Sequence, residues 1–263
     1  MIKLEPDPTP WDVKWRMLGF PVRVHPLFWL MALIMSYDRT TPFVFVLISV
    51  ACILVSILAH EFGHALCQRH YGDRENYIVL YAMGGLAVGQ REAPGVWPRI
   101  AIDLLGPLSG FVLGALAYGG MKAVEFAYIP YPGLYISYAF YVLFWINVIW
   151  GAVNLLPVFP LDGGQVLREL VQWKAPRRGD AFVFKISFYV ALVMALLFLA
   201  LAFSPYRSSN PTACYFPIVL FGVLAWQSYS LRRQILEYGF SNYDEDIAPN
   251  QPWEQDPDWW KKK

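Results

Sequence analysis

Long uncharged stretches, separated by short clusters of charged residues, dominate the pattern of this chain. A membrane-spanning helix needs roughly 20 apolar residues. Stretches suited to that role are Thr41–Ala59, Leu104–Met121, the second part of Phe126–Leu161 from about Leu134, Ile186–Tyr206 and Ser208–Leu231. The shorter apolar segment His25–Tyr37 is interpreted as a first span that extends at its ends. The pattern therefore predicts an all-α polytopic membrane protein with about six transmembrane helices.

One polar stretch between these spans has a different period. Residues 77–83 are typical of a strand, Gly84-Gly85 of a turn, and residues 86–90 of a second short strand. We expect a small membrane-associated β-hairpin within residues 76–92. Two interpretations stay open for it: an ordinary hairpin at the membrane interface, or an unpaired strand edge that captures an extended peptide.

These elements divide the chain into three parts. Residues 1–24 are expected to form a cytoplasmic N-terminal lead, and residues 25–231 a six-span membrane domain. Residues 232–263 combine acidic residues, prolines, tryptophans and a terminal lysine run, which predicts a disordered cytoplasmic tail.

Composition and charge support a membrane protein. The chain is 57% hydrophobic and 16% charged, against about 25% charged in ordinary globular proteins. Its 21 Lys and Arg nearly balance 20 Asp and Glu, so no basic excess indicates a nucleic-acid partner. Counted by polar stretch, 18 of these cations fall on one side of the predicted membrane and 3 on the other. This asymmetry predicts a multi-pass membrane protein with both termini in the cytoplasm.

The chemistry of the chain concentrates at the end of the second predicted span. His60-Glu61-Phe62-Gly63-His64 places two imidazoles at positions i and i+4, on one face of a helix. This spacing suits one zinc ion, and Glu61 is placed to activate a water molecule. Cys67, one turn further on, is either a packed thiol or an additional ligand.

A catalytic zinc site needs a third protein ligand. The other histidines and the acids close to predicted spans are the candidates: His25, His70, Asp103, Glu125, Asp162 and Glu169. Asp162 is distinguished by its context, because Pro157 and Pro160 break the helix before it and Gly163-Gly164 follow it. Broken backbone at membrane depth is tolerated where it lines a cavity or is buried in protein, and an acid there needs a partner.

The two-part motif resembles the site-2 protease family of intramembrane zinc metalloproteases. The resemblance rests on His60-Glu61-x-x-His64 followed by Asn154-x-x-Pro157-x-x-Pro160-Leu161-Asp162-Gly163-Gly164. Val24-His25-Pro26-Leu27-Phe28-Trp29 is similar to the start of the first span in the bacterial sporulation-type branch. Tyr81-Ala82-Met83-Gly84-Gly85 and Gly106-Pro107-Leu108 match further family elements in order. The PDZ and CBS domains common in the family are not seen.

The resemblance implies one zinc ion per chain, bound by His60, His64 and Asp162. It implies that Glu61 is the general base and later the acid, and that Asn154 lies near the scissile peptide or its oxyanion. The implied activity is cleavage of single-span membrane proteins in regulated intramembrane proteolysis, and the implied location is a bacterial cytoplasmic membrane. The expected partners are such a substrate, the lipid bilayer and a regulatory membrane protein.

Other interpretations of the same residues stay open. Asp162 could cap a helix, Asn154 could tie the broken helix, and Asp103 could pair with Arg99 one turn before it. His25 could be an interfacial residue or a gate. A zinc transporter, or a membrane protein that holds client helices without cutting them, would use similar ligands; the carboxylate of Glu61 argues against both. A CaaX-type membrane protease would need a different set of acids.

Overall fold

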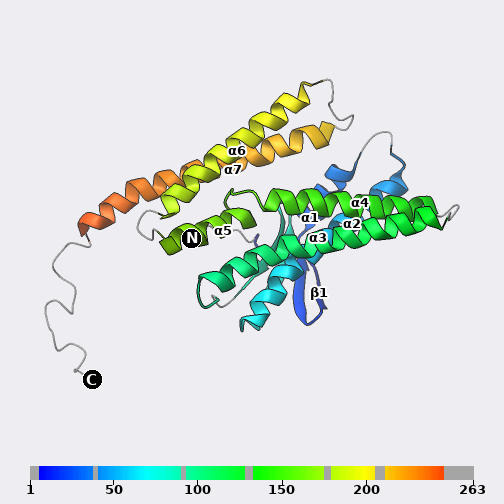
Figure 1. The fold of residues 1–263 in the computed structure, drawn as a ribbon, viewed down its shortest axis with the longest axis horizontal. Helices are drawn as coiled ribbons and strands as arrows, with labels where there is room; N and C mark the ends of the chain where they lie inside the picture. Colours follow the sequence, from blue (N-terminus) through cyan, green and yellow to red (C-terminus); the bar gives the residue numbers. More distant parts are fainter. Residues whose placement is uncertain are drawn as a thin grey trace.

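Seven helices form most of the described part of the chain. The computed structural model describes residues 6–37, 41–89, 93–127, 133–174, 179–204 and 211–245. The helices are α1 (Pro26–Ser36), α2 (Phe43–His70), α3 (Val96–Phe126), α4 (Gly133–Asn154), α5 (Asp162–Lys174), α6 (Gly179–Ala202) and α7 (Pro211–Glu245). In Figure 1, α2, α3 and α4 run side by side, and α6 and α7 form a second, antiparallel layer. The predicted helical class is confirmed.

Four of these helices are long and apolar enough to cross a membrane: α2, α3, α4 and α6. The predicted count of six is not confirmed. The first predicted span is α1, which has only 11 residues and at 1.5 Å per residue is about 17 Å long. The last predicted span lies in α7, whose apolar first half gives way to polar residues after Trp226.

The charged end of α7 differs from the predicted tail. The helix continues to Glu245, so the first residues of the segment 232–263 are helical. Residues 246–263 lie outside the described part of the chain, and so does the disorder predicted for them.

A four-stranded sheet lies against α2, and half of it was not predicted. The strands are β1 (Val13–Met17), β2 (Phe20–Val24), β3 (Tyr77–Tyr81) and β4 (Gly84–Val88), in the order β1-β2-β3-β4. The β3–β4 hairpin corresponds to the predicted one, with Tyr81 opposite Gly84. Its partner β2 comes from the supposed N-terminal lead and runs parallel to β3. Because the pairing is between segments about 55 residues apart, the local pattern of residues 1–24 did not reveal it.

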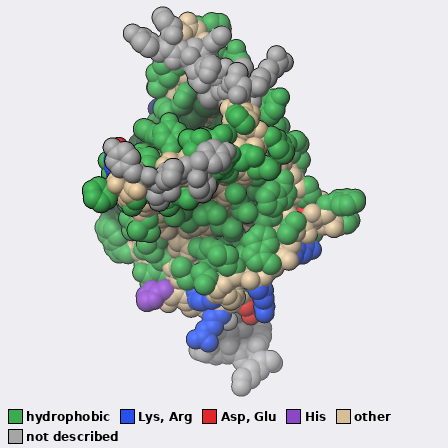
Figure 2. Space-filling model, turned by 90° about the vertical axis from the view of Figure 1, so that its right-hand side faces the viewer, with side chains coloured by type: hydrophobic (Ala, Val, Ile, Leu, Met, Phe, Trp, Pro, Cys, Tyr) green, Lys and Arg blue, Asp and Glu red, His purple; other side chains and the backbone are tan. Residues whose placement is uncertain are grey.

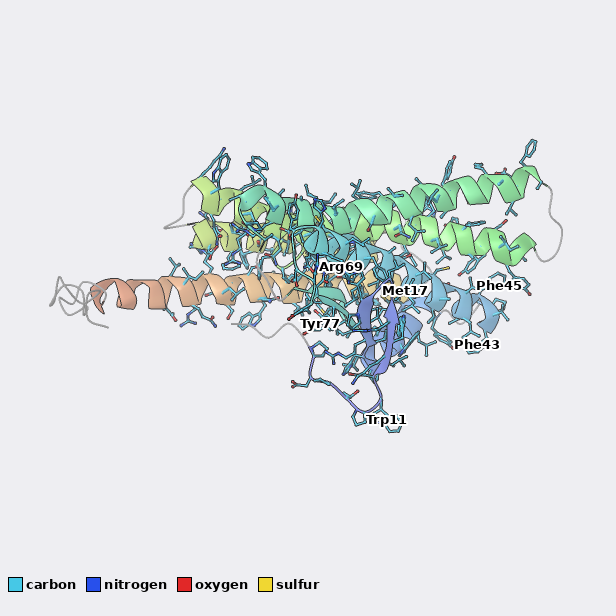
Figure 3. All side chains as sticks on the ribbon, turned by 90° about the horizontal axis from the view of Figure 1, so that it is seen from below. Trp11, Met17, Phe43, Phe45, Arg69 and Tyr77 are labelled. Carbon is cyan, nitrogen blue, oxygen red and sulfur yellow. The ribbon has the colours of Figure 1, made fainter. Side chains whose placement is uncertain are left out.

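A side chain of α2 holds the N-terminal hairpin in place. Two guanidinium nitrogens of Arg69 each donate 3.2 Å hydrogen bonds, one to Leu18 O and one to Gly19 O. The same guanidinium lies 3.4 Å from the centre of the Phe20 ring. Figure 3 shows Arg69 near Met17 and the strands that precede α1. These contacts hold the sheet against the polar end of α2.

The core joins this sheet to the helices, and the outer surface is apolar. Buried residues of β2, β3, α1 and α2 form one cluster, which includes Phe20, Phe28, Phe62 and Ile78. Large apolar side chains of α6, such as Val193 and Leu196, are more than half exposed. Figure 2 shows one face covered largely by hydrophobic side chains, with Lys and Arg gathered at its lower edge. Such a surface is suited to a lipid environment.

Candidate metal centre

The motif helix α2 carries His60, Glu61 and His64, and α3 packs unusually close to it. A Cβ added to Gly106 of α3 would lie 2.0 Å from Nε2 of His64, and a Cβ on Gly63 would lie 2.2 Å from Leu105 O. The two glycines therefore allow the helices to touch backbone to side chain. Ser109 Oγ donates a 2.8 Å hydrogen bond to Ala59 O, which ties the helices together directly before the motif.

Asp162 approaches His60 and His64 from a distant part of the chain, the start of α5. It is the first residue of α5, directly after the Pro157–Pro160 segment that interrupts the chain beyond α4. Cβ atoms on Gly163 and Gly164 would collide with the backbone of Leu155 and Phe159. The two glycines thus let the start of α5 fold back tightly onto this segment, and the fold aims Asp162 at α2.

The three predicted ligands converge. Nε2 of His60 lies 3.1 Å from Oδ2 of Asp162, Nε2 of His64 lies 3.4 Å from Oδ1, and the two Nε2 atoms are 3.2 Å apart. Ligands about 2.05 Å from a tetrahedral zinc ion would be roughly 3.3 Å apart. Oδ2 of Asp162 is buried and, apart from this approach of His60, has no hydrogen-bond partner among the described residues. The spacing and the donor set therefore fit a metal ion.

The surroundings favour ligation by these atoms. Nδ1 of His64 lies 2.7 Å from Ile102 O, so donation there directs Nε2 toward the cluster. Asp162 lies outside the four candidate spans. Burial alone would raise the pKa of its carboxyl, but hydrogen bonding and attraction from His60 and His64 lower this pKa to about 2. The carboxylate is therefore ionised near neutral pH and available to a cation.

Glu61 lies beside the cluster, under strand β4. Its side chain is almost fully buried, at 4% exposure, and the backbone of Ala87 hydrogen-bonds to its carboxyl group. A Cβ on Gly85 would lie 2.3 Å from Cγ of Glu61. Glycine at this point thus brings the β4 backbone directly onto the carboxyl group.

One cavity of about 500 Å³ connects these groups. His60, Glu61, His64, Asp162 and Asn154 all line it, together with Gly85 of β4. The Nδ2 atom of Asn154 donates a 3.0 Å hydrogen bond to Trp150 O of its own helix. This bond ties the amide to α4, as the structural interpretation requires, while the side chain still borders the cavity.

The remaining candidates lie elsewhere or have other partners. His25 caps α1, with Nδ1 accepting a 3.2 Å hydrogen bond from Leu27 N. Arg99 forms its ion pair with an acid of another helix: its Nε donates to Glu169 Oε2 at 2.6 Å and so links α3 to α5. Asp103 lines the cavity. Cys67 is a buried free thiol outside the metal-ligand group found among the described residues.

Some residues that build the site escaped the sequence reasoning. Ser187 of α6 is fully buried, accepts a 3.0 Å hydrogen bond from Phe159 N, and so anchors the interrupted segment before Asp162. Ile102 contributes only a carbonyl, which no side-chain pattern can reveal. Gly106 was noticed within Gly106-Pro107-Leu108, yet its contact with His64 follows only from the way α3 crosses α2.

Comparison with known proteins agrees with this site. Residues 121–198 match Peptidase family M50, a region that includes Asp162 but not the His60–His64 motif. A zinc metalloprotease of Methanocaldococcus jannaschii is 28% identical over 60% of this chain and 45% of its own length. Stage IV sporulation protein FB of Bacillus subtilis is 29% identical over 62% of this chain and 52% of its own length. The chain is therefore similar to zinc metalloproteases of the M50 family.

The fold is also similar to that of a solved protein. The solved structure of a site-2 protease from Methanocaldococcus jannaschii superposes with a TM-score of 0.56 at 22% identity. The superposition covers 84% of this chain and 94% of that one. A putative zinc metalloprotease of Synechocystis is 31% identical over 59% of this chain. The chain spans less than half the length of the Methanocaldococcus and Synechocystis relatives, 45% and 42%.

Proposed function

We propose that this chain is an intramembrane zinc metalloprotease that cuts single-span membrane proteins as a step of regulated intramembrane proteolysis. The observation that carries the proposal is the meeting of His60, His64 and Asp162 in one cavity, with Glu61 beside them and a strand edge above. A transporter would need further sites along a path. Among the described residues this is the one group of three suitable ligands.

Different residues of the chain have different roles in the proposed hydrolysis. His60, His64 and Asp162 would hold one zinc ion, which when bound would supply Lewis-acid activation of water and of the scissile carbonyl. Glu61 accepts a proton as the water oxygen bonds to the carbonyl carbon. It then gives that proton to the amide nitrogen as the C–N bond breaks. The amide of Asn154, at the wall of the cavity, would lie near the oxyanion.

The client has to be extended before it can react. In a helix each carbonyl is engaged by the N–H four residues on, so the cut segment must unwind. Strand β4 offers an edge above Glu61 on which an extended segment could lie. We infer that helix-breaking residues near the cytoplasmic end of the client speed cleavage, while Leu or Ala in their place slows it.

The test separates metal binding from catalysis. Membrane proteomics would compare cells that carry the wild-type protein with cells that carry Glu61→Gln. The client is identified by a membrane fragment that is present with the wild-type protein and absent with Glu61→Gln. With purified protein and that client, His64→Ala and Asp162→Ala should each lose most of the bound zinc, whereas Glu61→Gln should keep about one zinc per chain.

Cleavage by Glu61→Gln should fall by a factor of about a thousand or more, because no other group takes over the proton transfer. Zinc retained fully by Asp162→Ala would contradict the ligand set and point to Asp103 in the same cavity. Zinc bound stoichiometrically by a wild-type protein that cuts nothing, and whose client fragments do not depend on Glu61, would favour the non-proteolytic helix-binding alternative.

A further inference from the structure

The hydrogen-bonding groups of β4 alternate between its two sides. In an antiparallel pair, neighbouring residues turn their N–H and C=O groups alternately toward and away from the partner strand. His25, just after β2, donates a 2.8 Å hydrogen bond to Leu80 O, so the Leu80 carbonyl points toward β2 and away from β4. Gly85, opposite Leu80, therefore points away from β3, and so does Ala87 two residues on. No strand in the described part of the chain pairs with this outer side.

The outer groups of Ala87 are already occupied. Nε2 of Gln68 donates a 3.2 Å hydrogen bond to Ala87 O, and the backbone of Ala87 also hydrogen-bonds to Glu61. Gln68 is one helical turn beyond His64 on α2. Its Oε1 accepts a 3.2 Å hydrogen bond from Asn76, whose same nitrogen donates to Ala65 O at 2.7 Å. Asn76 is fully buried, so its hydrogen bond holds the side chain of Gln68 in place.

Gly85 differs from Ala87 in this respect. Among the described residues, no side chain hydrogen-bonds to its outward N–H or C=O, and its lack of a Cβ leaves the backbone directly above Glu61. An added strand gains its main-chain hydrogen bonds only where the edge is open. On β4 the open position is Gly85, and the edge ends where Gln68 binds Ala87.

We propose that Gln68 ends the client-binding edge of β4 and thereby fixes the register of the bound client, so that one peptide bond is presented to Glu61. The inference rests on the proposed proteolysis and adds a positioning residue to it. A strand can slip by two residues and keep the same side chains on the same face. Freeing the carbonyl of Ala87 from Gln68 would permit that slip, and the client would then be cut at a second bond two residues from the first.

The test is the distribution of product ends from the reconstituted full-length protein and its client, read by mass spectrometry. Gln68→Glu is the sharper variant, because it keeps the acceptor for Asn76 but loses the donor to Ala87 O. Gln68→Ala removes both contacts. We expect a wild-type preference for one bond of at least about tenfold, falling to within about threefold in both variants. Bound zinc should stay at the wild-type level, since Gln68 is not part of the ligand cluster.

The matched control is Gln227→Ala, since Gln227 of α7 lines the same cavity from another wall. This variant should cut the client at the wild-type bond only. The same single bond in both Gln68 variants, or zinc-bound Gln68 variants that cut nothing, would overturn this inference and leave the proposed function intact. Failure of the wild-type protein to cut the client would overturn both.

Discussion

At the scale of single residues, glycines determine how closely the reacting groups approach. Gly106 lets α3 reach His64, Gly63 lets α2 reach the backbone of Leu105, and Gly85 lets β4 lie on Glu61. None of the three is a ligand or a base. A methyl group on Gly106 or Gly85 would displace His64 or Glu61, and one on Gly63 would push α3 away from α2, so the effect of these glycines should be seen in metal binding and activity.

Gly106→Ala tests this at the metal. The added Cβ would lie 2.0 Å from Nε2 of His64, the atom that faces Asp162, so the imidazole has to move. Overpacking of this kind costs about 1–3 kcal/mol. We expect zinc affinity to fall by one to two orders of magnitude, measured by competition with a chelator. Gly119→Ala on the same helix is the control, since nothing lies within 4 Å of its added Cβ. Equal affinity in both variants would contradict this role.

The sequence predicted the ligands better than their surroundings. His60 and His64 follow from helical spacing, and Asp162 from an acid in broken, glycine-flanked backbone. The carbonyl of Ile102, the hydroxyl of Ser187 and the Gln68 contact with Ala87 depend on how distant segments meet. Periodicity along one segment carries no information about such meetings. The same limit explains why the ion pair between Arg99 and Glu169, which joins two helices, was not predicted.

At the scale of elements, the sheet joins the N-terminal segment to the catalytic helix. Hydropathy identified the apolar helices and the β3–β4 hairpin, because each is defined by a local pattern. It did not identify β1 and β2, whose short strands gain their stability from pairing with β3 and from Arg69. It also did not identify α5 as a helix, since the two glycines at its start indicate a loop when read locally.

Arg69→Ala should loosen the β1–β2 hairpin without disturbing the metal. The change removes the hydrogen bonds to Leu18 O and Gly19 O and the contact with Phe20, together worth about 1–2 kcal/mol. Amide hydrogen exchange in residues 13–24 should become roughly five- to thirtyfold faster, with bound zinc unchanged. The control is His70→Ala at the next, exposed position. Exchange as slow as in the wild-type protein would mean that β2–β3 pairing alone holds the hairpin.

At the scale of the whole molecule, the site lies toward one end of the membrane helices. At 1.5 Å per residue, His60 is about 26 Å along α2 from Phe43, and the helix as a whole is about 42 Å long. The hydrocarbon core is about 30 Å thick. The metal ligands therefore lie near the end of α2 that leads to Arg69 and the sheet. Under the proposed orientation this is the cytoplasmic end, and the client would be cut near its own cytoplasmic end.

Reporter fusions test both that orientation and the number of spans. The distribution of 18 and 3 cations predicts that the segments around Arg39, Lys122 and Arg207 lie outside the cell. Fusions after these residues should report the external side, and fusions after Arg74 and Lys174 the cytoplasm. The four long apolar helices account for the changes of side between the successive fusions after Arg39, Arg74, Lys122, Lys174 and Arg207. The signals at the two chain ends depend on whether α1, with 11 residues, and α7 also cross.

External signals at Arg39 and Arg207 with a cytoplasmic Arg233 would establish that α7 crosses. An external reporter at Lys14 together with an external Arg39 would mean that α1 only dips into the membrane, and the orientation of the amino terminus would then be wrong.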